Sequence, residues 1–279
     1  MMNNFAAFIL THGRPDNVKT YKTLKKCGYT GKIYLICDDE DTKLDEYKEK
    51  FKNVLVFNKD EVKKNIDVAD NFNKRNVILY ARNVCFDFAE KLGLDYFLEL
   101  DDDYTNFEFK YIEGDKLKSK KIKDLDYIFN LMLEYLETTN ALTVAFGQGG
   151  DFVGGAQGCI KDGTKRKAMN SFFCKTKNKF KFIGSINEDV NTYTLLGSQG
   201  KLFLTILDIA LEQLQTQSNK GGMTETYLDS GTYLKSFYSV MIMPSAVKIG
   251  LMGNKNMRIH HKIDWNRCVP KIINEKYKK

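Results

Sequence analysis

Short apolar runs alternate with amphipathic segments along the first third of the chain. Each run has the length of a strand, and the segments between runs repeat their apolar residues at the spacing of a helix. The predicted strands cover residues 5–10, 33–37, 54–57 and 96–100, and the predicted helices cover residues 16–27, 43–51 and 73–92. This alternation predicts βαβ units and a mostly parallel central sheet flanked by helices.

The pattern is less regular in the rest of the chain. Strands are predicted at residues 107–112 and 143–146, and helices at residues 125–136, 190–196 and about 225–241. The chain has three prolines, no internal repeat and no linker-like stretch, so residues 1–279 are expected to form a single domain. The predicted fold class is therefore α/β with a mixed C-terminal half.

Composition adds that the chain is globular and modestly basic. Hydrophobic residues make up 43% of it, and the net charge of +7 suits a polyanionic partner. The six cysteines form no C-x-x-C pair and are expected to be reduced thiols. The N-terminus has no signal-peptide pattern, and no apolar run approaches the roughly 20 residues that span a bilayer. We therefore expect a soluble cytoplasmic protein that makes no membrane contact.

Three consecutive carboxylates, Asp101, Asp102 and Asp103, follow the predicted strand at residues 96–100. An ordinary turn is one explanation, because Asp favours turns for backbone reasons. The other is a site for Mg²⁺ or Mn²⁺, which prefer carboxylate oxygens together with substrate phosphates and water. The neighbouring motifs decide between the two.

Polar loops also follow two earlier predicted strands. Ligands of parallel sheets bind outside the carboxyl ends of the strands, so these loops and the acidic triplet are expected to face one cleft. Arg14 is placed there to meet a phosphate, although a turn closed by Pro15 also explains the first loop. The loop residues are Thr11, His12, Gly13 and Arg14 after the first strand and Asp38 and Asp39 after the second.

A glycine-rich stretch at residues 147–155 contains a single carboxylate, Asp151. Phe152 stands where the dinucleotide fingerprint needs its third glycine, and the chain contains no G-x-x-x-x-G-K-[ST] motif. The stretch either lines a substrate site, where glycines allow a bulky ligand to approach the backbone, or merely turns the chain.

Glu188 and Asp189 are adjacent carboxylates at the start of the predicted helix at residues 190–196. Acids near a helix N-terminus offset the helix dipole, which is one explanation for the pair. The alternative is a general base that removes a proton from a hydroxyl nucleophile, a role that Asp151 can also fill.

Basic residues alternate with aromatic residues between residues 161 and 182. This pattern suits contacts with DNA phosphates and bases, and an amphipathic hairpin with solvated lysines is the alternative. The second basic run, residues 116–123, has the character of a solvated loop. The candidate DNA-binding residues are Lys165, Arg166, Lys167, Lys175 and Lys177.

His260 and His261 form an adjacent pair near the C-terminus, and His12 is the third histidine of the chain. An isolated histidine is usually structural. A histidine pair near the C-terminus is nevertheless a candidate for an additional metal ligand, because Mn²⁺ can be bound by imidazole as well as by carboxylates.

Taken in order, these motifs resemble those of the GT-A nucleotide-sugar glycosyltransferases. The resemblance is carried by residues 11–15, Asp38-Asp39, Ala81-Arg82-Asn83 and the triplet at residues 101–103 as a DxD motif. It implies a GT-A-like fold, a metal ion at Asp101 and Asp103, and a late metal ligand at His260 or His261. Glu188 and Asp189 would correspond to the motif that supplies the catalytic base of inverting members. The implied nucleotide-sugar contacts are Thr11, His12, Gly13, Arg14, Asp38, Asp39, Arg82, Asn83 and Asp102.

The second half of the chain resembles the TET-associated glycosyltransferases of bacteriophages. The similar segments are residues 184–190, 192–198, 218–222, 261–265 and 270–272. This resemblance implies transfer of a sugar from a UDP-sugar to 5-hydroxymethylcytosine in DNA, with Mn²⁺ or Mg²⁺ as the cofactor. Residues 1–105 would then form the nucleotide-sugar half, and residues 106–279 the acceptor and catalytic half.

Two other hypotheses share part of this evidence. A metal-dependent nucleotidyltransferase would also bind its substrate through acidic loops at strand ends. A basic DNA-binding module without catalytic activity would explain the positive charge and leave the acidic motifs without a metal.

Overall fold

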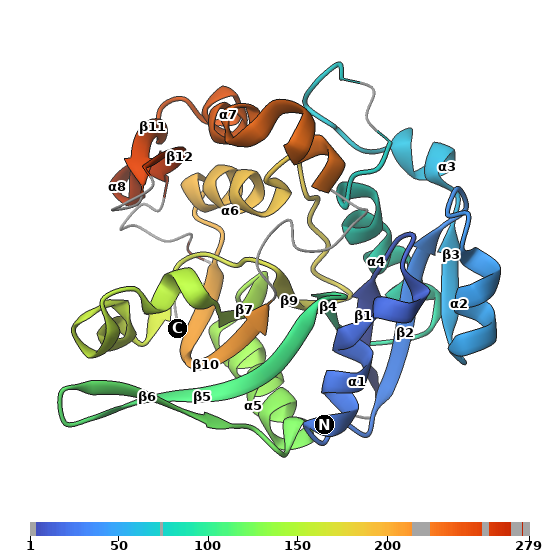
Figure 1. The fold of residues 1–279 in the computed structure, drawn as a ribbon, viewed down its shortest axis with the longest axis horizontal. Coiled ribbons are helices and arrows are strands. Elements are labelled where there is room, and N and C mark those ends of the chain that lie inside the picture. Colours follow the sequence, from blue (N-terminus) through green and yellow to red (C-terminus); the bar gives the residue numbers. More distant parts are fainter. Residues whose placement is uncertain (1–3, 73–74, 214–223, 253–256, 269–274, 276–279) are drawn as a thin grey trace.

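A twisted ten-stranded sheet crosses the molecule in the order β3-β2-β1-β4-β9-β7-β10-β5-β6, with β8 paired to β10 (Figure 1). The computed structural model describes residues 4–72, 75–213, 224–252, 257–268 and 275. The strands are β1 (Phe5–Leu10), β2 (Lys32–Asp38), β3 (Val54–Phe57), β4 (Tyr96–Asp101), β5 (Tyr104–Glu113), β6 (Lys116–Lys121), β7 (Thr143–Gly147), β8 (Thr164–Lys165), β9 (Ser171–Lys175) and β10 (Phe203–Gln213).

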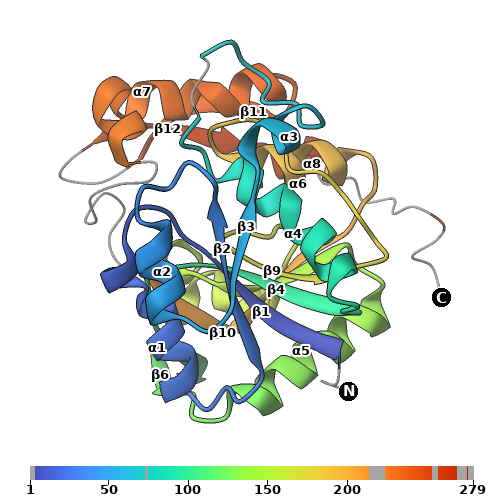
Figure 2. The same ribbon diagram turned by 90° about the vertical axis from the view of Figure 1, so that its right-hand side faces the viewer.

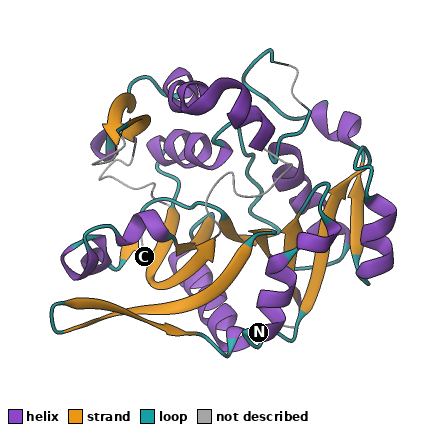
Figure 3. Cartoon of the chain, in the orientation of Figure 1, coloured by secondary structure: helices purple, strands orange, loops and turns teal. Residues whose placement is uncertain are grey.

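Helices cover both faces of the sheet (Figure 3). A separate hairpin, formed by β11 (Val247–Met252) and β12 (Arg258–Ile263), lies beside the last long helix. The α-helices are α1 (Lys19–Lys26), α2 (Leu44–Lys50), α3 (Lys59–Lys63), α4 (Leu79–Lys91), α5 (Leu125–Thr139), α6 (Glu188–Ser198), α7 (Thr224–Ile242) and α8 (Trp265–Cys268). Short 3₁₀ helices are η2 (Pro15–Asn17), η3 (Gly149–Phe152), η4 (Gly155–Gln157) and η5 (Cys159–Asp162).

The first half of the sheet is parallel and the second half is mixed. Strands β3, β2, β1 and β4 all run in the same direction, as βαβ connections require. Strand β9 then pairs antiparallel with β4 and β7, and β5 pairs antiparallel with β10 and β6. The predicted α/β class, with helices around the sheet and a mixed second half, is confirmed.

Each face of the sheet carries its own hydrophobic core. Successive side chains of a strand point to opposite faces, so Ala7 and Ile9 of β1 pack with α1 and α5, while Ala6 and Phe8 pack with α4. Figure 2 shows α1 and α2 on one side of β1–β3 and α4 on the other. Because β1 is buried on both faces, its whole length reads as one apolar run.

Several predicted boundaries and assignments were wrong. The helix predicted from residue 73 begins at Leu79, and the predicted helix at residues 16–27 is split into η2 and α1. Residues 116–121 form strand β6 instead of a loop. Residues 161–182 are not a hairpin, because β9 inserts into the middle of the sheet and buries Phe172 and Phe173 on opposite faces.

The prediction also omitted strands β8, β9, β10, β11 and β12 and the short helices α3 and α8. Residues 218–222 and 270–272, which contribute to the family resemblance, lie outside the described residues. Among the residues that the structure describes, no helix is both long and apolar enough to cross a membrane.

Candidate active site

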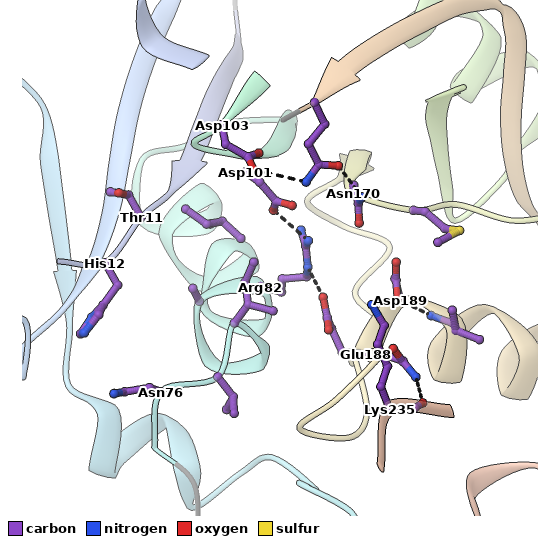
Figure 4. A pocket seen from close by; sticks show the side chains of 18 of the residues that line it. Thr11, His12, Asn76, Arg82, Asp101, Asp103, Asn170, Glu188, Asp189 and Lys235 are labelled. Atoms are coloured by element: carbon purple, nitrogen blue, oxygen red, sulfur yellow. Dashed lines mark hydrogen bonds and ion pairs between the residues drawn. The ribbon is translucent and has the colours of Figure 1, made fainter. Parts of the chain in front are cut away.

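A cavity of about 530 Å³ lies at the carboxyl ends of β1, β2 and β4. One wall carries side chains from the three strand-end loops, and the opposite wall carries side chains from α6, α7 and β12. Figure 4 shows these side chains converging from the two walls. The two acidic strand-end loops therefore do face one cleft, together with segments that are distant in sequence.

Within the acidic triplet, the first and third carboxylates line the cavity and the second does not. Asp102 is fully buried, and its Oδ2 accepts hydrogen bonds from Thr11 Oγ1 at 2.6 Å and Arg14 Nε at 2.7 Å. Asp101 and Asp103 both line the cavity. The middle residue thus holds the first loop against the triplet, and its two neighbours are the carboxylates that line the cavity.

Thr20 of α1 fixes the backbone of the triplet. Its Oγ1 donates to the carbonyl oxygen of Asp101 at 2.6 Å and accepts from the amide of Tyr104 at 2.9 Å. Its own amide donates to the carbonyl oxygen of Asp102 at 3.1 Å. Three backbone polar groups of this turn are thereby satisfied, as the burial of Asp102 and Tyr104 requires.

Asp103 lines the cavity and has one unsatisfied carboxylate oxygen. Its Oδ1 is buried and has no hydrogen-bond partner among the described residues, while Gln213 Nε2 lies 3.5 Å from Oδ2. Burial and the nearby charge of Asp102 raise the pKa of Asp103. A cation at this position would supply the missing partner and favour the charged carboxylate.

Arg82 of α4 lies between the acidic triplet and α6. Its buried guanidinium donates to Asp101 Oδ1 at 2.9 Å and to Glu188 Oε1 at 2.8 Å, and its Nη1 lies 3.5 Å from Glu99. The ring of Phe172 packs 4.8 Å from the guanidinium carbon. Figure 4 shows Arg82 between the two carboxylates. Although Arg82 lines the cavity, its Nε and Nη2 already donate to protein acids.

The acidic pair Glu188-Asp189 begins helix α6 on the opposite wall. Asn187, directly before it, has a left-handed backbone (φ 55°), and its side-chain amide donates to the carbonyl oxygen of Lys235 at 2.7 Å. Burial and the charge of Glu188 raise the pKa of Asp189 to about 6. Asp189 therefore combines a position on the cavity wall with the basicity expected of a general base near neutral pH.

Helix α7 and strand β12 contribute the nitrogen groups of this wall. Burial lowers the pKa of Lys235, although Asp189 and Glu188 act in the opposite direction. His260 and His261 stack with ring centroids 4.2 Å apart, and burial lowers the pKa of His261 to about 4. His261 is therefore neutral at pH 7, and its Nδ1 has no hydrogen-bond partner among the described residues.

The far end of the cavity carries a chain of ion pairs from the first two loops. His12 Nδ1 lies 2.7 Å from Asp38 Oδ2, and Lys59 Nζ lies 2.8 Å from Asp38 Oδ1. Burial alone would raise the pKa of Asp38, but the hydrogen bonds from His12 and Lys59 lower it to about 2. The Asp38 carboxylate is thus held charged and in a fixed position.

Besides Asp102, three predicted nucleotide-sugar residues lie outside the cavity lining. The side chain of Asp39 accepts from the amide of Lys59, and Asn83 bonds to the backbone of Phe182. The amide of Gly13 donates to Asp41 Oδ2 at 2.7 Å. All three support the structure around the cavity, whereas Thr11, His12, Arg14 and Asp38 line it.

The candidate DNA-binding residues and Asp151 are also outside the lining, although Met169 and Asn170 of the same segment line it. Asp151 forms an ion pair with Lys167, and its Oδ2 accepts from the amide of Gln148 at 3.0 Å. Lys165 pairs with an acid three residues earlier, and Lys175 pairs with Glu137 on α5. Lys177 is exposed.

Sequence reasoning missed several polar side chains of the cavity. Gln213, Asn170 and Gln148 form a hydrogen-bonded row that begins at Asp103, with Asn170 Nδ2 donating to Gln148 Oε1 at 3.0 Å and to Gln213 Oε1 at 3.2 Å. Lys59, Lys235 and Arg258 were missed as well. Lys59, Lys235 and Arg258 are single residues outside any motif, and Gln148 and Asn170 lie in segments that were singled out for other residues. The positive φ of Asn170 is visible only in the structure.

Asp101 and Asp103 are the side chains best suited to hold a divalent cation. Within the described ranges, no three His, Cys, Asp or Glu side chains cluster as a complete ligand set. Mg²⁺ usually needs only one or two carboxylates, because substrate phosphates and water complete its shell. The unsatisfied Oδ1 of Asp103 fits a metal of this kind, which would bind together with a diphosphate.

Comparison with known protein families identifies one match. A profile of the TET-associated glycosyltransferase family matches residues 5–222. Among solved structures, S. aureus TarS is similar with 10% identity and a TM-score of 0.44, over 76% of this chain and 37% of TarS, so the chain spans little more than a third of that protein. Mycobacterium tuberculosis glucosyl-3-phosphoglycerate synthase, solved with Mn²⁺, uridine diphosphate and phosphoglyceric acid, is similar with 7% identity and a TM-score of 0.47, over 93% of this chain and 87% of that one. No curated protein matches the sequence.

Proposed function

Because the chain belongs to the TET-associated glycosyltransferase family, we propose that it transfers a sugar from a UDP-sugar to the hydroxymethyl group of 5-hydroxymethylcytosine in DNA. The observation that carries this proposal is the meeting of three carboxylates in one cavity, Asp101 and Asp103 from the strand-end triplet and Asp189 from α6. Phage DNA modification in the cytoplasm of the host is the setting that the resemblance implies.

The donor binds at the strand-end wall in this proposal. Arg14 lines the cavity and contacts a phosphate oxygen. Its Nε donates to Asp102, which holds the guanidinium in place for that contact. The charged Asp38 accepts a hydroxyl of the ribose or a donor of the uracil. Both groups are held by ion pairs or hydrogen bonds before the substrate arrives, so little side-chain freedom is lost when it binds.

A divalent metal, Mn²⁺ or Mg²⁺, is proposed to bind with the donor at Asp101 and Asp103. When bound, such a metal neutralises the charge of the UDP leaving group. His261, which is neutral and has a free Nδ1 among the described residues, is the proposed late ligand, with His260 stacked beside it. The protein contributes the two partly buried carboxylates.

Proton transfer is assigned to Asp189. Its carboxylate accepts the proton of the hydroxymethyl group while that oxygen forms a bond to the anomeric carbon. The bond from the anomeric carbon to the diphosphate oxygen breaks, and its electron pair leaves with UDP. A carboxyl with a pKa of about 6 is ionised at neutral pH and still basic enough to share the proton in the transition state.

The acceptor reaches this wall as an unstacked base. A hydroxymethylcytosine within a duplex is inaccessible to a carboxylate at a cavity wall, so the nucleotide is proposed to flip out of the helix. Residues 161–182 remain a candidate for phosphate contacts. Lys177 is exposed there, whereas a phosphate at Lys165 or Lys175 would have to displace an acidic partner.

The decisive experiment mixes the protein with DNA containing 5-hydroxymethylcytosine, Mn²⁺ and a panel of UDP-sugars, and measures the mass of the DNA. A gain of one sugar residue, with release of UDP, is the expected result. Unmodified cytosine DNA is the control. Release of pyrophosphate from a nucleoside triphosphate, with no sugar transfer, would instead indicate a nucleotidyltransferase.

A further inference from the structure

The β5–β6 arm, residues 108–121, is a two-stranded ribbon at the end of the central sheet. Its register pairs Glu108 with Lys121 and continues to the pair Glu113 and Lys116. Strand β6 ends the strand order, so it has β5 as a neighbour on one side only. Figures 1 and 3 show the arm extending sideways from the sheet, far from β2 and β3.

One face of the arm alternates aromatic and basic side chains. Residues paired across antiparallel strands point to the same face, so Phe109 lies beside Lys120, and Tyr111 lies beside Lys118. Phe109 is 38% exposed and Tyr111 is 42% exposed. The opposite face lies toward the 3₁₀ helices, where Lys110 Nζ is 5.5 Å from the ring centroid of Phe152. Both aromatic side chains are therefore accessible to solvent, as is Ile112 on the opposite face, which is 42% exposed.

The lysines of this arm are largely available to a ligand. Lys118 pairs with Glu113, but Lys116, Lys120 and Lys121 form no ion pair within the part of the chain that the structure describes. This differs from the sequence-predicted DNA segment, where Lys165, Lys167 and Lys175 are all paired with acids.

From this arrangement we infer that the β5–β6 arm binds the DNA duplex that flanks the acceptor nucleotide. A two-stranded ribbon fits the major groove of B-DNA, and exposed lysines on it can reach the phosphates along the groove. Phe109 and Tyr111 supply the apolar contacts to base edges and methyl groups that such a ribbon can make. The choice of DNA as the partner rests on the proposed function.

Protection of a sheet edge is the simpler explanation for lysines on β6. Edge strands often carry lysines because charge discourages pairing with another molecule. That explanation accounts for lysines but not for two large aromatic side chains exposed between them. It also makes a different prediction: loss of the lysines would cause aggregation and leave the DNA affinity of the monomer unchanged.

The test replaces the three lysines of the aromatic face together, Lys116→Ser, Lys118→Ser and Lys120→Ser. The matched control is Lys48→Ser, Lys52→Ser and Lys64→Ser, which removes the same charge from exposed lysines around α2 and α3, one of them also in an ion pair. Binding to an unmodified duplex is measured by fluorescence anisotropy at several salt concentrations. Circular dichroism and gel filtration confirm that each variant is folded and monomeric.

We expect the arm variant to bind the duplex at least about tenfold more weakly than the wild type. The slope of log K against log[salt] should become shallower by roughly 0.9 for each phosphate that the variant no longer binds. The control variant should bind like the wild type. A duplex containing 5-hydroxymethylcytosine should show a raised KM in the arm variant, while transfer to a modified trinucleotide, which has no flanking duplex, should be unchanged.

Equal duplex affinity in the arm and control variants would overturn the inference. So would a loss of affinity in a variant with Lys165, Arg166 and Lys167 replaced by Ala while the arm variant binds normally. Because duplex binding is measured without donor or modified base, these outcomes are separate from the proposed function. If wild-type protein binds the duplex through the arm but transfers no sugar, the inference holds and the proposed reaction fails.

Discussion

Arg82 connects the two acidic motifs of the cavity through one buried guanidinium. It donates to Asp101 on one side and to Glu188 on the other. The sequence-based hypothesis assigns this residue to the nucleotide-sugar, whereas its geometry is that of a residue that positions both carboxylates. Planar, forked donors suit this task, and lysine lacks them.

Arg82→Lys is therefore expected to lower kcat by roughly 100-fold while changing the KM for the donor little, because displaced catalytic groups reduce the rate of the chemical step. Arg82→Met should destabilise the fold by about 3–5 kcal/mol, since it leaves buried carboxylates without their partner. Steady-state kinetics and urea unfolding measure the two effects. A raised KM with unchanged kcat would return Arg82 to a direct donor contact.

Asp189→Asn removes the proposed base and keeps the shape of the side chain. Transfer should fall by about 10²–10⁴-fold, the usual contribution of general base catalysis. Binding of UDP, measured by calorimetry, should stay close to that of the wild type. The matched variants Glu188→Gln and Asp151→Asn identify the base if Asp189→Asn retains activity.

The pH dependence of the reaction follows from the same residue. A base must be deprotonated, so kcat/KM should fall as the pH is lowered through about 6, the pKa of Asp189. The charge of Glu188 contributes to raising that pKa, so Glu188→Gln should move the acidic limb to lower pH. If kcat/KM falls at the same pH in the wild type and in Glu188→Gln, Asp189 is not the group that titrates.

The raised pKa of Asp189 also has a consequence for stability. The folded state binds this proton more tightly than the unfolded state, so its contribution to stability is largest below the ordinary carboxyl pKa and declines as the pH rises through about 6. Asp189→Asn should flatten this decline. At neutral pH the buried, ionised Asp189 therefore lowers the stability of the fold, which is consistent with a carboxyl that is buried for its catalytic role.

At the scale of elements, the turn before α6 positions the base. Asn187 adopts a left-handed backbone, and its side-chain amide bonds to the backbone of Lys235 and to Ser239 Oγ on α7. Asn tolerates this conformation better than most residues, and its amide joins two helices that face the cavity.

Asn187→Ala should lose both the amide contacts and the ease of the left-handed turn, costing about 1–3 kcal/mol. Asn187→Gly keeps the turn and loses only the amide hydrogen bonds, so it should be the more stable of the two. Both variants should lower kcat by misplacing Asp189. Urea unfolding together with kinetics gives the comparison, and equal stability of the two would show that the turn carries no strain.

The elements that the sequence predicted well are those with a regular pattern and a local cause. Strands β1, β2 and β3 and helix α5 agree with prediction within a few residues. Each is buried on fixed faces, so its apolar residues recur at the spacing of a strand or a helix. Strand β9 was missed because its basic and aromatic residues read as a surface hairpin. Its insertion between β4 and β7 depends on partners far along the chain.

At the scale of the whole molecule, the cavity joins both halves of the chain. Its walls come from residues 10–103 on one side and residues 148–261 on the other. A ligand that bridges these walls binds only the folded state, so it should stabilise the entire domain.

UDP with Mn²⁺ is expected to raise the melting temperature by several degrees. Saturation at 100 times Kd contributes about 2.7 kcal/mol, and each kcal/mol shifts the Tm of a domain of this size by about 2–4 °C. Asp103→Asn, or a chelator, should remove most of the shift. An equal shift in Asp103→Asn, measured by differential scanning fluorimetry, would place the metal elsewhere.

The sequence by itself determined the family, the α/β class and the positions of the acidic motifs. The family prediction is confirmed by the match over residues 5–222. These features are local or ordered along the chain: a strand needs only its own apolar run, and an acidic loop at a strand end needs only that strand. The order of the motifs along the chain was therefore enough to assign the acidic triplet and the pair Glu188-Asp189 to one proposed site.

Only the tertiary structure decided how the motif residues are divided among tasks. Asp102 is bonded to Thr11 and Arg14, whereas Asp103 lines the cavity and has one unsatisfied carboxylate oxygen, although the two are adjacent in sequence. Arg82 reaches Glu188 across 106 positions of the chain. Side-chain direction, burial and charge pairing depend on neighbours brought together by folding, and no pattern along the sequence encodes those neighbours directly.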